Sequence, residues 1–127
     1  TDGYERALAY QWMFFEQYSH EPYIAVRRAL LRFPERAAQA TPERLAQTLD
    51  RGNKALGVMN AWLEKRSFFA GGAYSVADLA LYAYTHVAAG GGFQLDGYPA
   101  VVAWLDRVRN DAGHVDMQWT PDSSAAI

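Results

Sequence analysis

The chain has 127 residues, a length that suits one domain with a modest core, and its net charge of −2 gives no electrostatic basis for binding nucleic acid or an anionic membrane. It contains no cysteine, which excludes disulfides, thiolate metal sites and a cysteine nucleophile. Half of its residues are apolar and 14% are aromatic, far from the composition of a disordered chain.

The first predicted helix covers residues 4–18. At 100° per residue its charged and amide side chains, Glu5, Arg6, Glu16 and Gln17, fall on one side. Pro22 is expected to end or kink this helix, because the proline ring clashes with an earlier carbonyl and donates no hydrogen bond. Pro22 can equally open a second segment at its first helical turn, and that segment continues to Pro34 with helical spacing. The apolar residues of the first helix fill a broad arc: Tyr4, Ala7, Leu8, Tyr10, Phe14, Phe15 and Tyr18.

The next helix has the clearest pattern. Thr41 is a good N-cap, and Pro42 suits the first helical position, where no N–H is needed. Gly52 lies on the apolar stripe although glycine costs about 1 kcal/mol relative to alanine in a helix interior, so we expect a close helix crossing there. The stripe predicts an amphipathic helix of about six or seven turns. Its residues are Leu45, Leu49, Gly52, Leu56, Met59 and Leu63.

The second half of the chain continues without a strand pattern. A packed loop is expected over 66–74, a buried helix from Ser75 to the glycine run 90–92, and a last helix from Pro99 that ends by Gly113. The tail 114–127 has no period, although Met117 and Trp119 could hold part of it down. No segment alternates at period two, so the prediction is an all-α helical bundle. The last helix is expected to point Val101, Trp104, Leu105 and Val108 inward.

The start of the buried helix carries a capping signal. Ser75 precedes the helix and Asp78 lies three positions later, so the serine oxygen can accept a helix N–H while the carboxylate reaches back to the serine N–H. The carboxylate also lies at the positive end of the helix dipole. We therefore assign Ser75 and Asp78 a structural capping role, and we expect no catalytic residue in this chain.

Three stretches resemble the C-terminal domain of bacterial-type glutathione transferases. The family's signature is a serine or threonine cap, one residue, alanine and aspartate after a glycine-containing loop, and residues 72–78 read GAYSVAD. The stretch QWMFFEQYSHEPYIA, 11–25, is similar to the first helix of that domain. GYPAVVAWLDRV, 97–108, resembles a later helix that starts at Tyr-Pro and has an inward tryptophan. The resemblance covers nearly all of 3–119.

This resemblance implies a two-domain transferase. A complete member has an N-terminal thioredoxin-like domain, which binds glutathione and supplies the residue that activates it. Since this chain has no β pattern, we expect that domain to be absent from it and 1–127 to be a single helical domain. Glutathione would be the co-substrate of the complete enzyme, with no cofactor bound by this chain alone and no activity from it in isolation. The resemblance further implies a cytoplasmic homodimer that acts in detoxification.

The family's helical domain supplies the wall of the pocket for the hydrophobic electrophile. By resemblance, the wall comes from the first helix and the buried helix, and we assign substrate binding to Tyr10, Phe14, Gln17 and Tyr84. Tyr10, Phe14, Gln17 and Tyr18 share a helix face that combines aromatic area with an amide, a mixture suited to a large apolar substrate. Aromatic residues at helical spacing also occur in cores, so core packing stays an alternative for these rings.

Other interpretations of the sequence stay open. A non-catalytic helical interaction module of the same fold would fit the same composition, as would a small bundle unrelated to transferases. His20 could act as an acid or base, but a bond to nearby backbone is the simpler interpretation, and His86 is expected to be a neutral, hydrogen-bonded core group. The spacing of the three histidines predicts no metal site, and no apolar run reaches the roughly 18 residues that a membrane span needs.

Overall fold

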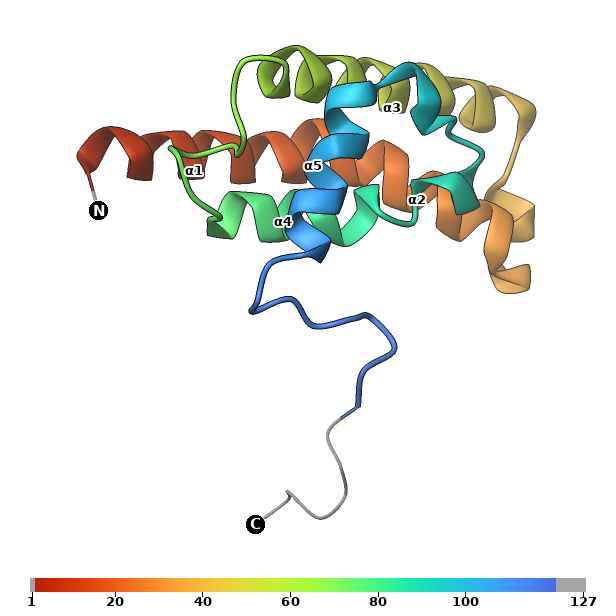
Figure 1. The fold of residues 1–127 in the computed structure, drawn as a ribbon. Coiled ribbons are helices and arrows are strands. Elements are labelled where there is room, and N and C mark those ends of the chain that lie inside the picture. Colours follow the sequence, from red (N-terminus) through yellow and green to blue (C-terminus); the bar gives the residue numbers. More distant parts are fainter. Residues whose placement is uncertain (1, 121–127) are drawn as a thin grey trace.

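The computed structural model describes residues 2–120, and every regular element in that range is helical (Figure 1). The all-α prediction is therefore confirmed for the described residues. In chain order the α-helices are α1 (Gly3–Phe15), α2 (Glu21–Arg32), α3 (Pro42–Leu63), α4 (Val76–Thr85) and α5 (Pro99–Arg109). A π-helical turn, η1 (Glu16–His20), joins α1 to α2, and three 3₁₀ turns are η2 (Pro34–Gln39), η3 (Ala88–Gly91) and η4 (Leu95–Gly97).

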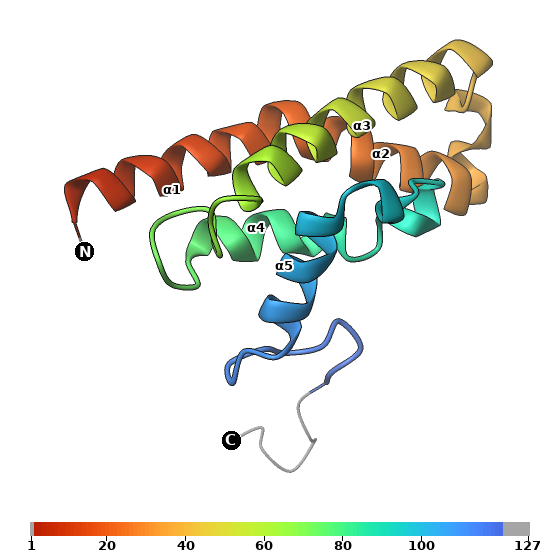
Figure 2. The same cartoon turned by 45° about the horizontal axis from the view of Figure 1, so that its top comes forward.

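The helices pack around one core. α1, η1 and α2 follow one another as one long helical rod. α1 and α4 lie side by side in both views, and α3 runs along α2 on the side of this rod opposite to α4 (Figures 1 and 2). α5 packs against α3 and α4. The core brings Phe69 of the loop before α4 against Trp104 of α5, with ring centroids 5.1 Å apart in an edge-to-face arrangement. Leu56, Met59 and Leu81 are fully buried in the same cluster.

The helix does not end at Pro22. Helical backbone continues from α1 through η1 into α2, and Pro22 lies in the first turn of α2. In η1 the N–H of Glu21 bonds to the carbonyl of Glu16, five residues back. This wider turn leaves room for the proline ring, whose clash would otherwise break an α-helix. Pro22 thus opens a second helical segment at its first turn, one of the two expected outcomes, and the interruption before it takes the form of a π-turn.

The first helix also buries a different face from its apolar arc. Tyr10, Phe14 and Tyr18 are exposed, whereas Trp12, Glu16 and His20 form the buried line. Trp12 packs between Phe69 and Trp62, at ring centroid distances of 4.6 and 5.2 Å. Because α3 covers one side of the rod and α4 covers another, the buried line lies between them and the aromatic arc is left outside.

α3 forms as its sequence pattern predicts. Thr41 accepts the N–H of Arg44 at 3.3 Å, Pro42 is the first helical residue, and Leu56, Met59 and Leu63 are buried. The close approach expected at Gly52 is present. A Cβ placed on Gly52 would overlap the ring of Phe93 and lie 3.3 Å from Ile24 of α2.

We predict opposite outcomes for two glycines in this helix. Gly52→Ala should lower the free energy of unfolding by about 1–3 kcal/mol, because the added methyl group overpacks against the buried Phe93 ring. Gly57→Ala should raise it by about 0.5–1 kcal/mol, because nothing lies within 4 Å of its added Cβ and the helix gains propensity. Urea unfolding of both variants tests this. Equal effects of the two substitutions would mean that the packing at Gly52 does not constrain α3.

α4 is shorter than the sequence suggests and ends at Thr85, followed by the 3₁₀ turn η3. Gly91 in this turn lies so close to α2 that an added Cβ would sit 3.2 Å from the Arg28 nitrogen. The chain must therefore leave the helix before the glycine run in order to pack there. Arg27 fixes the turn by donating to the Gly91 carbonyl at 2.7 Å and to the Leu45 carbonyl.

The last helix follows the prediction, whereas the tail does not. α5 begins at Pro99, ends at Arg109, and buries Val101, Trp104, Leu105 and Val108. Met117 and Trp119 were expected to hold the tail down, but both are more than half exposed. Residues 121–127 of the tail lie outside the described residues.

Candidate functional site

Asp78 lies at the centre of a buried hydrogen-bond network at the start of α4. Its Oδ2 accepts the Ser75 N–H at 3.0 Å and the Ser75 hydroxyl at 2.7 Å, within a capping box. Its Oδ1 accepts the Phe69 N–H at 3.1 Å and the Trp104 indole N–H at 2.9 Å. The carboxylate is fully buried. It therefore joins three segments and has no free oxygen directed to a substrate.

The substrate-binding candidates lie on the two helices that pack side by side. Tyr10 and Phe14 project from α1 with 55% and 74% of their surface exposed, and Gln17 follows on the exposed side of η1. Tyr84 lies on α4 and is 38% exposed. Within the chain these four residues are surface groups and not core, so the aromatic area is available to a ligand or a partner.

A cleft of about 640 Å³ lies where α1 faces the loop before α4. Of the four candidates, only Tyr10 lines it. Phe14, Gln17 and Tyr84 lie outside this lining, so the chain by itself does not enclose the proposed pocket. The lining comprises Glu5, Arg6, Ala9, Tyr10, Ala70, Gly72, Ala73, Tyr74, Ser75 and Val76.

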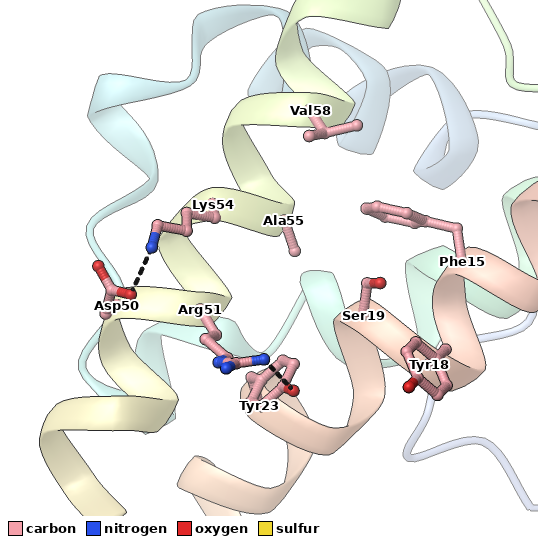
Figure 3. A pocket seen from close by; sticks show the side chains of 9 residues that line it. All are labelled: Phe15, Tyr18, Ser19, Tyr23, Asp50, Arg51, Lys54, Ala55 and Val58. Atoms are coloured by element: carbon pink, nitrogen blue, oxygen red, sulfur yellow. Dashed lines mark hydrogen bonds and ion pairs between the residues drawn. The ribbon is translucent and has the colours of Figure 1, made fainter. Parts of the chain in front are cut away.

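A second hollow, of about 410 Å³, lies between the α1–α2 rod and α3 (Figure 3). Arg51 donates to the Tyr23 hydroxyl at 3.2 Å, and Lys54 pairs with Asp50 at 2.8 Å. Tyr18 lines the hollow from η1 and is 84% exposed. The remaining lining residues are Phe15, Ser19, Ala55 and Val58. This surface lies on the α3 side of the rod, whereas the cleft with Tyr10 lies on the α4 side.

His20 is fully buried in η1 and is bonded differently from the sequence interpretation. Its Nε2 lies 2.8 Å from the Thr85 hydroxyl on α4, whereas a bond to nearby backbone was expected. The Thr85 hydroxyl donates its proton to the Leu81 carbonyl at 2.6 Å, so it must accept from His20, and Nε2 carries the proton. Nδ1 has no partner among the described residues. Burial lowers the pKa of His20 to about 4, so the ring stays neutral at pH 7 and cannot reach solvent to exchange a proton.

Glu16 is a buried acid that the sequence pattern placed on the polar side. Burial raises its pKa, a hydrogen bond from Gln17 opposes that rise, and the nearby charge of Glu21 adds to it. Glu16 lies four residues after Trp12, one helical turn along the same side of α1, so it falls on the buried line that begins with Trp12.

His86 caps α4 instead of lying deep within it. Its Nδ1 lies 2.9 Å from the Tyr82 carbonyl, and its ring stacks on the Tyr82 ring at 4.7 Å with only 5° between the planes. It is half-buried, with one face of the ring covered. The expected hydrogen bond is present, although the expected deep burial is not.

Among the described residues, no three His, Asp or Glu side chains gather in a way that could hold a metal ion. Within the same range, no helix is both long and apolar enough to cross a membrane.

Comparison with known proteins assigns the family. Residues 9–111 match the model of the glutathione S-transferase C-terminal domain. The chain is 46% identical to a crystal structure of a glutathione S-transferase from Pseudomonas fluorescens Pf-5, with a TM-score of 0.84, covering 90% of this chain and 56% of that one. It is 41% identical to a possible glutathione S-transferase from Rhodopseudomonas palustris, with a TM-score of 0.88, covering 99% of this chain and 59% of that one.

A curated relative is more distant. The disulfide-bond oxidoreductase YfcG of Escherichia coli K12 is 27% identical over 106 residues, which is 84% of this chain and 48% of that protein. The chain thus spans about half of the length of its relatives. The family match covers most of α1 through α5, including the Asp78 network, so the chain belongs to the family of glutathione S-transferase C-terminal domains.

Proposed function

We propose that this chain is the helical half of a glutathione transferase and that the outer face of α1 and α4 forms the wall that binds a hydrophobic electrophile. The observation that carries the proposal is the exposure of Tyr10 and Phe14 on α1 together with that of Tyr84 on α4, a helix that packs against α1. A folded domain rarely leaves so much aromatic surface bare unless a ligand or another domain covers it. Gln17 adds an amide that can hold a polar group of the substrate.

The missing side of the pocket is assigned to a thioredoxin-like domain. The two transferase structures are matched over only 56% and 59% of their length, so a large part of each of those proteins lies outside the matched domain. That domain would bind glutathione and stabilise its thiolate, while the α1–α4 face holds the electrophile within reach of the sulfur. The product is the thioether of glutathione and the electrophile. We place this detoxification reaction in the cytoplasm.

We assign the opposite surface to a second copy of the chain. The hollow between the rod and α3 has Phe15 and Val58 in its lining and Tyr18 at its exposed edge. It lies away from the cleft with Tyr10, so a homodimer formed there leaves the electrophile wall free. The half-buried Met13 of α1 is a further candidate for this contact.

The test separates the chain from the complete enzyme. We expect the 127-residue chain alone to show no conjugation of glutathione to chlorodinitrobenzene above the uncatalysed rate, because we assign the group that activates the thiol to the thioredoxin-like domain. Fused behind the thioredoxin-like domain of the Pseudomonas fluorescens enzyme, it should give turnover. Activity of the chain alone would contradict the two-domain proposal. A folded fusion that binds glutathione and yet gives no turnover would favour the alternative of a non-catalytic interaction module.

A further inference from the structure

A third cavity, of about 420 Å³, lies between α4 and the segment 113–118. In both views this segment lies on the other side of α4 from α1, and Tyr74 is the one lining residue that this cavity shares with the cleft at Tyr10 (Figures 1 and 2). Its volume falls in the range of pockets that hold small organic ligands, roughly 300–1,000 Å³. The side chains and backbone that line it are Tyr74, Leu79, Tyr82, Ala83, His86, Val87, Gly113, His114, Val115, Asp116, Met117 and Gln118.

The walls of this cavity are flat aromatic rings held in fixed positions. Tyr82 stacks on His86 at 4.7 Å and meets the edge of His114 at 5.2 Å with 79° between the planes. Tyr82 is in turn supported by Trp104 of the core at 6.1 Å. Val115 and Met117 add apolar surface from the opposite side, and both are more than half exposed. A planar ring fits between such walls with little rearrangement of the protein.

The polar groups of the cavity indicate which polar substituent a planar ligand should have. The Tyr82 carbonyl can only accept, so Nδ1 of His86 donates to it, and in that tautomer the unshared electron pair lies on Nε2. Nε2 can therefore accept a hydrogen bond from a ligand. The Tyr74 hydroxyl stays protonated because burial, the charges of Asp78 and Asp111, and Tyr82 all raise its pKa. Tyr74 and Tyr82 both line the cavity and can donate.

The charge of the cavity disfavours an anion. The carboxylate of Asp116 is part of the lining, and its Oδ1 accepts the Gln118 N–H at 2.8 Å, which keeps it in place. A ligand carboxylate or sulfonate would lie near this negative charge, whereas a neutral hydroxyl would not be repelled. A ligand hydroxyl can also donate to Nε2 of His86 and accept from a tyrosine hydroxyl at the same time.

We propose that the cavity between α4 and the segment 113–118 is a binding site for a planar phenol, whose hydroxyl donates to Nε2 of His86 and accepts from Tyr74 or Tyr82. The site uses a different face of α4 from the proposed electrophile wall, and it shares only Tyr74 with the cleft at Tyr10. The cavity volume of about 420 Å³ is large enough to hold two fused aromatic rings.

The experiment is a titration of the isotope-labelled 127-residue chain with β-naphthol at about pH 7.5, followed by two-dimensional NMR. We expect saturable shifts at residues 79–87 and 113–118 below about 1 mM ligand. β-Naphthyl methyl ether has the same ring without a donor, and β-naphthoate is anionic. Each should bind at least about fivefold more weakly, because one leaves the histidine acceptor unpaired and the other meets Asp116.

One substitution isolates the acceptor. His86→Phe keeps a flat ring on Tyr82 and removes Nε2, so β-naphthol should bind at least about fivefold more weakly, while Tyr4→Phe, at the far end of α1, should change nothing. Equal affinity for the methyl ether would overturn the proposal, as would shifts confined to residues 10–18. These two readouts use the unmodified chain, so they decide the matter even if the His86 variant does not fold.

Discussion

Asp78→Ala should lower the free energy of unfolding by about 3–5 kcal/mol, enough to leave the domain partly unfolded at 37 °C. The substitution removes an acceptor that takes four hydrogen bonds at a fully buried position. The Phe69 N–H and the Trp104 indole N–H would then be buried without partners, and each such group costs about 1–3 kcal/mol. Urea unfolding followed by circular dichroism measures the loss.

Two companion variants show where this energy comes from. Ser75→Ala removes only the capping partner and should cost about 0.5–2 kcal/mol. Asp78→Asn keeps an acceptor for Phe69 and Trp104 but turns an amide N–H toward the Ser75 N–H, so its cost should fall between the other two. If Asp78→Ala costs no more than Ser75→Ala, then Asp78 is only a cap and the bonds to the loop and to α5 contribute nothing.

Acidification should destabilise the domain through His20, by about 3 kcal/mol between pH 7 and pH 4. The pKa of His20 is lowered from 6.5 to about 4 in the folded state, so in this window the unfolded chain binds the extra proton. Stability is therefore fully present above pH 6.5 and is lost as the pH falls toward 4. The cause is burial, which penalises the charged imidazolium at this fully buried position.

The variant His20→Phe isolates this contribution from the titration of the carboxylates. It removes the titrating group and leaves the Thr85 hydroxyl bonded to the Leu81 carbonyl. Urea unfolding at a series of pH values should show a smaller loss of stability for the variant than for the unmodified chain. Parallel pH curves for the two proteins would mean that His20 is not held neutral by the fold.

Local patterns predicted the elements of the fold better than their contacts. The cap and stripe of α3 and the start of α5 at Pro99 were readable because the signals lie within a few residues of the feature. Asp78 and Ser75 were recognised as a cap for the same reason. The bonds from Asp78 to Phe69 and Trp104 span 9 and 26 residues, and no helical period contains that information.

The first helix shows why amphipathicity misled. Its aromatic arc was a strong apolar pattern. The helix lies between α3 and α4, however, and buries only the narrow line of residues that faces both of them. Tyr10, Phe14 and Tyr18 lie outside this line and are exposed. The π-turn then places His20 on the buried line that begins with Trp12 and Glu16. The exposure of the candidates on α1 could therefore not be derived from composition and spacing, and the partner of His20 on α4 could not be derived either.

The central claim is that the outer face of α1 and α4 holds the electrophile, and steady-state kinetics of the fused enzyme test it most directly. Tyr10→Ser combined with Phe14→Ser should lower kcat/KM for chlorodinitrobenzene roughly tenfold or more while the KM for glutathione stays unchanged, because only the electrophile contacts are removed. Tyr4→Ser, an equally exposed tyrosine in the first turn of α1, serves as the matched control and should leave both constants unchanged. If the double variant keeps its kcat/KM, or if its KM for glutathione rises in parallel, the electrophile does not bind on this face and the central claim is wrong.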